Sequence, residues 1–216
     1  KLVELFITLG RYSLVVVLGL GLMIFVIYPA ILMLVVKGKI SYTGFFKRIS
    51  PAQFLAFSTS SSAATLPVTI ECVRDRVGVS KEITSFVLPI GATVNMDGTS
   101  LYQAVAAIFL AQIHLIDLSF GQQMTIVLTA TLASIGSAAV PSAGLVMLMI
   151  VLGSVGLNPA WIAFIIPIDR LLDMMRTVVN VTGDATVATV IAASEDELSV
   201  VTDKELDEMY SEELDL

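Results

Sequence analysis

The sequence predicts an all-α membrane protein with two inverted re-entrant helical hairpins and broken transmembrane helices, and three observations support this. Hydrophobic residues make up 56% of the 216 residues and charged residues only 14%, against about 25% in an average soluble domain. Long apolar runs recur, and strings of small and polar residues interrupt several of them at mid-length. The last run carries a charged face, which in a membrane normally points into a bundle or a water-filled cavity.

The first predicted element is a transmembrane helix over residues 13–36, an uncharged run that contains two glycines and one proline. At about 1.5 Å per residue it is long enough to cross a hydrocarbon core of roughly 30 Å. The run is followed by a basic loop with Lys37, Lys39, Lys47 and Arg48. Because positive loops favour the cytoplasmic side, residues 1–50 are interpreted as a transmembrane helix and a cytoplasmic loop.

A re-entrant hairpin is predicted after this loop. Residues 51–73 are apolar except for the central string Ser58-Thr-Ser-Ser-Ser-Ala-Ala-Thr-Leu-Pro67, and a second basic stretch at 74–81 follows. If both basic stretches are cytoplasmic, the segment enters and leaves by one face, on arms of about ten residues that reach roughly half-way across the bilayer. A plain surface linker is the alternative, which the apolar flanks disfavour.

A broken transmembrane helix is predicted over residues 83–113. The run is long enough to span, yet its middle reads Gly91-Ala-Thr-Val-Asn-Met-Asp-Gly-Thr99. These residues predict two half-helices joined by an unwound piece, which is tolerated at that depth only if it is buried in protein or lines a cavity. Together with the hairpin it forms a second unit, residues 51–113.

The rest of the apolar chain repeats this order. Residues 124–157 form a second predicted hairpin with the tip Ser134-Ile-Gly-Ser-Ala-Ala-Val-Pro-Ser-Ala-Gly144. A final amphipathic crossing covers residues 159–193, so a third unit spans 114–193. Its motif Asn180-Val-Thr-Gly-Asp184 matches Asn95-Met-Asp-Gly-Thr99 of the first half.

The repeat is interpreted as inverted. No Lys or Arg occurs between Lys81 and Arg170, so the connection near residues 114–117 is assigned to the extracytoplasmic side. Paired interrupted segments in two inverted halves are typical of a transporter with its site at the membrane midplane. A chance recurrence of small-residue strings is the alternative.

Polar residues of the final crossing recur at steps of three and four and therefore share one helix face. They are Asp169, Asp173, Arg176, Thr177, Asn180 and Asp184. The planar fork of Arg176 suits a carboxylate, and Asp173 either pairs with Arg176 or accepts from an ammonium group. A structural ion pair between Arg176 and Asp173 or Asp169, with no ligand, is the alternative.

A cation site is predicted at the broken helix. Unwound carbonyls at Gly91, Thr93 and Asn95, with the carboxylates of Asp97 and Asp184, offer several oxygens and negative charge. Na⁺ is the first choice, because Ca²⁺ favours a more clustered, Asp-rich loop.

The remaining features exclude other classes of site. Residues 195–216 carry ten acids and one lysine, so residues 194–216 are interpreted as an acidic, solvated and mobile cytoplasmic tail. The single Cys72 excludes an internal disulfide, and the single His114 is too isolated for a metal site. No activated nucleophile is visible, so the chain is not expected to be an enzyme, and no nucleic acid partner is expected. A ligand-gated ion channel is a further alternative, because it too could use re-entrant hairpins.

Three ordered strings resemble the dicarboxylate/amino acid:cation symporters, the glutamate transporter family. They are Ser-Ser-Ser-Ala-Ala-Thr-Leu-Pro from Ser60, Gly-Ala-Thr-Val-Asn-Met-Asp-Gly-Thr from Gly91, and Asp-Met-Met-Arg-Thr-Val-Val-Asn-Val-Thr-Gly-Asp from Asp173. The similarity covers nearly all of residues 1–195 and is closest to prokaryotic sodium–aspartate transporters. It implies an elevator transport domain whose second hairpin is the extracellular gate.

By motif position, the resemblance implies site residues of two kinds. Substrate contacts would come from Ser60, Ser61, Ser62, Thr99, Val140, Gly144 and the residues between these two, Asp173, Arg176, Thr177 and Asn180. Sodium ligands would come from Gly91, Asn95, Asn180 and Asp184; from Thr93, Ser134, Ile135 and Ser137; and from Asn95 with Asp97. In the family, the aspartate of the Asp-x-x-Arg pair meets the substrate's amino group and the arginine meets its side-chain carboxylate.

The resemblance thus implies sodium-driven uptake of aspartate or glutamate across the plasma membrane. Gln103 stands where eukaryotic glutamate carriers have a glutamate linked to proton coupling, so proton coupling is not expected. The chain begins at what resembles the sixth span, so the third span and the spans that form a homotrimer in the bilayer would lie outside it. A neutral amino acid carrier is disfavoured by Arg176, and a C4-dicarboxylate carrier by Asp173.

Overall fold

The computed structural model describes residues 2–202 and 204–206, and it confirms the all-α class for this part of the chain, which contains no β-strand. The elements are α1 (Leu2–Leu22), a π-helix (Met23–Ile27), α2 (Tyr28–Val36), α3 (Tyr42–Thr59), α4 (Ser62–Glu71), a second π-helix (Cys72–Val77), α5 (Lys81–Val94), α6 (Asp97–Ile113), α7 (Phe120–Ile135), α8 (Ala143–Ser154), a 3₁₀-helix (Pro159–Phe164) and α9 (Ile166–Ser194).

In the described part of the chain, two helical stretches are long and apolar enough to cross a membrane, Phe6–Val36 and Ile166–Ser194. The first is helical from residue 2, earlier than the predicted start at residue 13, because the single Arg11 is accommodated on an exposed helix face. At its centre the π-helix changes the backbone pairing, and the Tyr42 hydroxyl donates to the Ile24 carbonyl there. This bond ties the first helix to the start of α3.

The arms of the first helical hairpin are longer than the ten residues predicted. α3 begins at Tyr42, where Ser41 caps it by accepting from the Gly44 backbone N–H at 3.1 Å. The predicted loop residues Lys47 and Arg48 are therefore helical, and Arg48 is buried. The interpretation of these two cations as loop residues was wrong, because Lys47 lies on an exposed face of α3 and Arg48 donates to the carbonyls of Gly44 and Val201. The boundary at residue 50 thus falls inside α3.

The predicted break in the first long segment is confirmed, but it is short. Only Asn95 and Met96 leave the helix, between α5 and α6. Gly91 and Thr93 lie inside α5, so the prediction that their carbonyls belong to an unwound segment is wrong. The matching motif of the second half produces no break at all: α9 is α-helical throughout, including Gly183.

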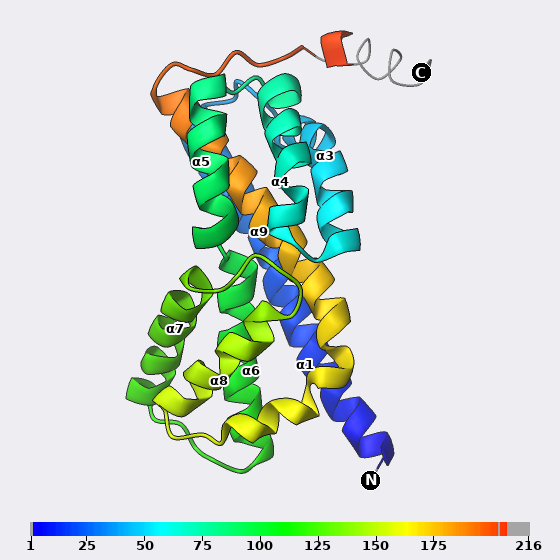
Figure 1. Ribbon diagram of the computed structural model, residues 1–216, viewed down its shortest axis with the longest axis vertical. Coiled ribbons are helices and arrows are strands. Elements are labelled where there is room, and N and C mark those ends of the chain that lie inside the picture. The colour runs from blue at the N-terminus through cyan, green and yellow to red at the C-terminus, as the bar shows by residue number, and fades with distance from the viewer. Residues whose placement is uncertain (1, 203, 207–216) are drawn as a thin grey trace.

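The two hairpins approach the middle of α9 from opposite ends of the molecule, as Figure 1 shows. The α3–α4 turn meets the α7–α8 turn, where the Ser61 hydroxyl donates to the Ala139 carbonyl at 2.7 Å. The Ala63 backbone N–H lies 3.4 Å from the same carbonyl. α9 packs against α3, α5, α6 and α2, which places its polar face beneath both turns.

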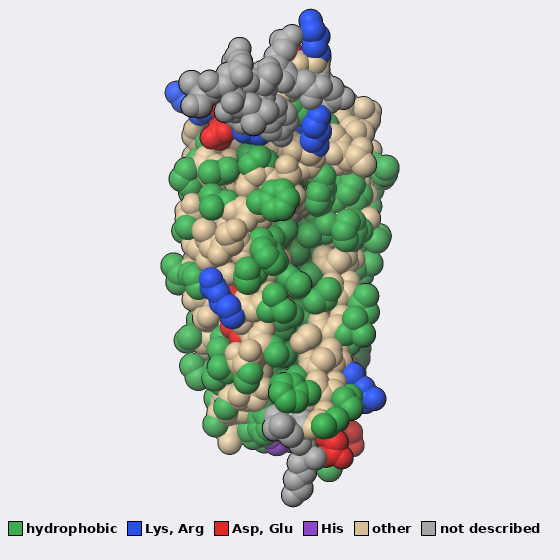
Figure 2. All heavy atoms as spheres, turned by 90° about the vertical axis from the view of Figure 1, so that its right-hand side faces the viewer, with side chains coloured by type: hydrophobic (Ala, Val, Ile, Leu, Met, Phe, Trp, Pro, Cys, Tyr) green, Lys and Arg blue, Asp and Glu red, His purple; other side chains and the backbone are tan. Residues whose placement is uncertain are grey.

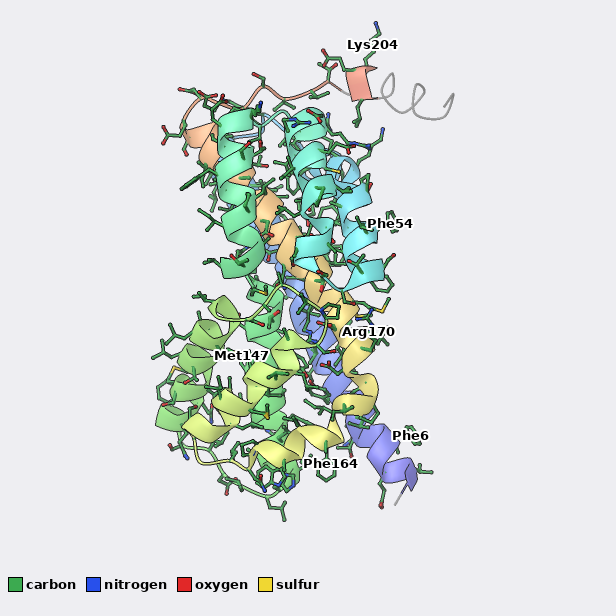
Figure 3. All side chains as sticks on the ribbon, in the orientation of Figure 1. Phe6, Phe54, Met147, Phe164, Arg170 and Lys204 are labelled. Atoms are coloured by element: carbon green, nitrogen blue, oxygen red, sulfur yellow. The ribbon has the colours of Figure 1, made fainter. Side chains whose placement is uncertain are left out.

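The outer surface carries many apolar side chains. In Figure 2, hydrophobic side chains cover much of the middle of the molecule, and most charged side chains lie toward its ends. Phe6, Phe54 and Phe164 project outward from the helices in Figure 3 and are 67%, 74% and 43% exposed. Lipid or other protein segments would cover such a surface in a membrane.

The backbone of the first part of the acidic tail, residues 195–202, is hydrogen-bonded to the protein, whereas its three acidic side chains are exposed, as predicted for a solvated tail. We call this segment the C-terminal strap. The Ser199 backbone N–H donates to the Gly78 carbonyl at 2.9 Å, and Arg48 donates to the Val201 carbonyl at 2.6 Å. Leu198 is buried beside them. The prediction considered the net charge of the tail and not its apolar residues, such as Leu198. Residues 203 and 207–216 lie outside the described chain.

Gly78 permits this docking, and Gly78→Ala is expected to release the strap. Gly78 has φ +95°, and an added Cβ would lie 1.8 Å from the Ser199 carbonyl oxygen. Limited proteolysis should cleave the strap about tenfold faster, the effect of roughly 1.4 kcal/mol of lost local stability. Gly156→Ala is the control, because Gly156 has φ +77° but no atom within 4 Å of the added Cβ. Equal cleavage of the two variants would contradict the expectation.

Candidate functional site

The predicted polar face of α9 is buried. Asp169, Asp173, Arg176, Asn180 and Asp184 are each no more than 7% exposed. Arg170, next to this face, points outward and is exposed (Figure 3). Because buried charges need partners, the contacts of these residues show what the site can hold.

Arg176 lies at the centre of one half of this face. Its Nη2 donates to Asp173 Oδ1 at 2.8 Å and to Asp169 Oδ1 at 3.1 Å. The guanidinium carbon lies 3.7 Å from the centre of the Tyr102 ring, and the Tyr102 hydroxyl donates to Asp169 at 2.7 Å. Nη2 therefore forms the internal ion pair that the sequence left open as an alternative. Nε and Nη1 are buried without a protein partner among the described residues, so two donors remain for a ligand.

Asp173 connects this cluster to the second hairpin. Its Oδ2 accepts a hydrogen bond from the Ser142 backbone N–H at 2.8 Å. Ser142 has φ +62° and stands directly before α8, whose first-turn residue Gly144 lies against Arg176 and Thr99. The Gly144 carbonyl accepts from Gln103 at 3.0 Å. The second tip is therefore held by the side chain expected to meet an ammonium group.

The predicted substrate residues surround a small cavity of about 20 Å³. Its lining includes Ser60, Ser62, Thr99, Val140, Gly144, Asp173, Thr177 and Asn180. Of the predicted substrate residues, Ser61 and Arg176 do not line the cavity: Ser61 caps α4, and Arg176 lies against Gly144, where an added Cβ would be 3.4 Å from its Nη1. A water molecule needs roughly 10–15 Å³ of such space, so an amino acid would fit only after the two tips separate.

Asn180 holds the helix break against α9. Its Oδ1 accepts from the Gly98 backbone N–H at 2.8 Å, and its Nδ2 donates to Thr99 at 3.2 Å. An added Cβ at Gly98 would lie 2.6 Å from the Arg176 carbonyl oxygen, so α6 approaches α9 closely. The break that the sequence predicts is thus positioned by the residue that both predicted sites share.

The carboxylates near the break have no cationic partner among residues 2–202 and 204–206. Asn95 donates to Asp184 Oδ1 at 2.9 Å, and Gly91 lies so close that an added Cβ would be 2.6 Å from that oxygen. Neither Asp184 nor Asp97 forms a salt bridge with a described Lys or Arg. Two buried or half-buried carboxylates without a counter-charge favour binding of a cation.

Tyr28 belongs to this cluster, and the sequence analysis missed it. Its hydroxyl donates to Asp97 Oδ2 at 3.0 Å and lies 3.2 Å from the Val179 carbonyl oxygen. A tyrosine inside an otherwise aliphatic spanning run was the available signal, because a buried hydroxyl needs a polar partner.

The other predicted sodium set is not gathered in the same way. Ser134 and Ser137 are buried, but Thr93 and Ile135 are exposed. The Ser134 hydroxyl donates to Thr131 and the Thr93 hydroxyl to Ile90, each within its own helix. No cluster of three or more His, Cys, Asp or Glu occurs in the described part of the chain, so any cation site here must use carbonyl, amide and hydroxyl oxygens beside one or two carboxylates.

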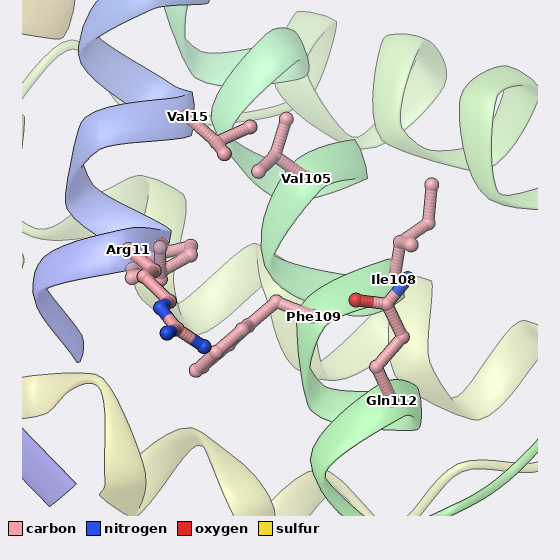
Figure 4. Close-up of a pocket in the computed structure, with 7 residues that line it drawn as sticks. Arg11, Val15, Val105, Ile108, Phe109 and Gln112 are labelled. Atoms are coloured by element: carbon pink, nitrogen blue, oxygen red, sulfur yellow. The ribbon is translucent and has the colours of Figure 1, made fainter. Parts of the chain in front are cut away.

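A larger cavity of about 360 Å³ lies apart from this face, between α1 and α6 (Figure 4). Arg11 from α1 extends toward Phe109 of α6 there, and the other labelled lining residues are Val15, Val105, Ile108 and Gln112. Its walls are mostly apolar and lack the convergent polar groups found along α9.

The comparison with protein families decides the family question. The sodium:dicarboxylate symporter family matches residues 1–194. The chain belongs to this symporter family. The prediction from the three motifs is therefore confirmed at the level of the family, while the narrower likeness to prokaryotic carriers stays a prediction.

Relatives of this family member include animal transporters. It is 50% identical to an excitatory amino acid transporter of Caenorhabditis elegans over 177 residues, 82% of this chain and 35% of that protein. It is 52% identical to excitatory amino acid transporter 3 of Oryctolagus cuniculus over 182 residues, 84% of this chain and 34% of that protein. The symporter-family chain thus spans about a third of the length of these relatives. Membership in a transporter family identifies it as part of a membrane protein.

Proposed function

We propose that this chain forms the substrate- and sodium-binding part of a symporter that couples sodium entry to uptake of an acidic amino acid. The observation that carries the proposal is the division of charge along α9. Within the described part of the chain, two buried donors of Arg176 have no partner, and two carboxylates near the helix break have no cationic partner. The region of Arg176 and Asp173 is suited to a zwitterion that carries a second carboxylate, and the region of Asp184 in α9 and Asp97 in α6 is suited to a cation.

The substrate class follows from the region of Arg176 and Asp173. A carboxylate accepts strong, charge-assisted hydrogen bonds from a guanidinium, and Nε and Nη1 of Arg176 are the buried donors that remain. A two-bond fork would in addition need Nη2, which now donates to Asp169 and Asp173. Asp173 would receive the ammonium group of the substrate. Aspartate or glutamate satisfies both groups, whereas a C4-dicarboxylate would meet repulsion from Asp173 and a neutral amino acid would leave Arg176 without a second carboxylate.

Sodium would be held in the region of Asp184 and Asp97. We assign Gly91, Asn95, Asn180 and Asp184 to one site and Asn95 with Asp97 to another; the set of Thr93, Ser134, Ile135 and Ser137 is a third. This last set requires movement of the second tip, because two of its members are exposed in the structure. Sodium is a transported ion here and not a resident cofactor.

We further propose that both hairpins are re-entrant and that the second one is the extracellular gate of an elevator-type transport domain. The division into residues 1–50, 51–113, 114–193 and 194–216 belongs to this proposal, with the first boundary inside α3. The complete protein would be a homotrimer in the plasma membrane, assembled through spans that the relatives carry outside the matched segment. Aspartate versus glutamate is decided by the binding measurement below.

The test is calorimetric titration of aspartate and of glutamate into a full-length transporter that carries this segment, first in Na⁺ and then with choline in its place. We expect binding that requires sodium. Binding of equal strength in choline would contradict sodium coupling, and succinate binding with no amino acid binding would favour the dicarboxylate carrier. An uncoupled current much larger than substrate flux would favour an ion channel.

A further inference from the structure

We propose that Tyr28 is a positioning residue for a sodium ion at Asp97: its hydroxyl fixes one oxygen of the Asp97 carboxylate and leaves the other for the ion. The inference rests on the proposed function and adds a residue of the first helix to it. No motif of the sequence pointed to this residue.

The location of the Tyr28 hydroxyl supports this role. Tyr28 is 3% exposed and packs in the apolar core that includes Leu20 and Val179. In such surroundings a hydroxyl without a partner costs free energy, so its partners determine where the ring lies. The hydroxyl has one hydrogen and two nearby acceptors, Asp97 Oδ2 at 3.0 Å and the Val179 carbonyl at 3.2 Å. The carboxylate is the closer and the stronger acceptor because it is charged.

Gly183 shows that this contact is built into the packing. An added Cβ at Gly183 would lie 2.8 Å from the Tyr28 hydroxyl oxygen and 2.7 Å from Asn95 Nδ2. Tyr28 and Asn95 therefore pack on the same small residue of α9. Asn95 in turn donates to Asp184, so one glycine brings together the side chains that hold Asp97 and Asp184.

The physical effect is on the orientation of a carboxylate. A carboxylate that binds a cation does so best when its other oxygen is held by a hydrogen bond, because the bond fixes the rotamer before the ion arrives. Tyr28 provides this bond from α2, an element distant in sequence from both α6 and α9. Loss of the hydroxyl would leave the ring in place and free Asp97 to rotate.

The test is Tyr28→Phe in a full-length transporter that carries this segment. The measured quantity is the Na⁺ concentration that gives half of the sodium-induced rise in Tm, without amino acid present. We expect this concentration to increase about tenfold, the lower end of the effect of removing an outer-shell partner of a bound metal. Aspartate affinity at saturating Na⁺ should change less than about twofold, because the Arg176 cluster is intact.

Tyr42→Phe is the matched control. It removes a neighbouring tyrosine hydroxyl that donates to the Ile24 carbonyl and not to a carboxylate, and it should leave the sodium midpoint unchanged. An unchanged midpoint in Tyr28→Phe, or an equal increase in both variants, would overturn the proposal.

A double-mutant cycle with Asp97→Asn tests the pathway. If Tyr28 acts through Asp97, the double variant should have the sodium midpoint of Asp97→Asn alone; additive effects would overturn the positioning role. A wild-type protein whose Tm does not respond to Na⁺ would refute the proposed function first and this inference with it. The two failures are distinguishable: the first is seen in the wild-type protein, whereas failure of this inference alone is seen only in the variants, with the wild-type response to Na⁺ intact.

Discussion

Replacing Arg176 with alanine is expected to reduce the affinity for aspartate roughly 100- to 4,000-fold. Removing one member of a buried charge cluster typically costs about 3–5 kcal/mol, because the remaining charges lose their partner. Here Asp169 and Asp173 would both lose it, and the substrate would lose the two guanidinium donors that remain open. Neutral amino acids should then compete better, since no unpaired guanidinium opposes them.

Two further variants separate binding from folding in this experiment. Arg176→Lys keeps the charge without the planar fork and should show an intermediate loss. Arg170→Ala removes an exposed arginine from the same helix and should leave aspartate affinity unchanged. Calorimetry in saturating Na⁺ provides the comparison. Aspartate affinity that survives in Arg176→Ala would show that the ion pair with Asp169 and Asp173 is purely structural.

Asp184→Asn is expected to raise the Na⁺ concentration needed for aspartate binding about a hundredfold or more. A single unit charge about 4 Å from a cation contributes roughly 4 kcal/mol at an effective dielectric constant of 20. The substitution preserves shape and the contact with Asn95. In sodium-free choline buffer, the variant should melt at or above the wild-type temperature, because no described cation compensates the buried carboxylate.

This reversal between the two buffers distinguishes an ion site from a structural defect. A structural defect would lower Tm in both salts. Asp75→Asn is the control, because Asp75 is partly exposed and paired with Arg74 at 2.6 Å. Its loss should not change the sodium requirement. If Asp184→Asn binds aspartate with an unchanged sodium requirement, Asp184 does not hold the ion.

Much of the fold was predictable because membrane burial constrains polar residues strongly. A string such as Ser60-Ser-Ser62 inside an apolar run has few solutions other than a turn within protein, and two such turns meet in the structure. The buried face of α9 follows from the steps of three and four between Asp169 and Asp184. The three motif strings also identified the family, whereas composition alone indicates only a membrane protein.

The errors came from treating local composition as structure. Lys47 and Arg48 are helical, and Arg48 donates to the carbonyls of Gly44 in α3 and of Val201 in the C-terminal strap. The Asn180-to-Asp184 motif matches the broken stretch of the first half, yet α9 is continuous there, and Gly183 gives room to the Tyr28 hydroxyl. The partners of Tyr28 lie 69 and 151 positions away, a separation that no local pattern encodes.

The contact between Asp173 and Ser142 has a consequence for selectivity. Within the closed pocket, Arg176 already donates a hydrogen bond to Asp173, and the Ser142 backbone N–H donates a second one to the same carboxylate. A ligand must exchange with these internal contacts, so only the surplus appears as affinity. A zwitterion with a second carboxylate replaces both contacts at once. A ligand with only a carboxylate or only an ammonium group breaks both internal contacts of Asp173 but replaces only one of them. These internal hydrogen bonds therefore help to exclude ligands that lack either group.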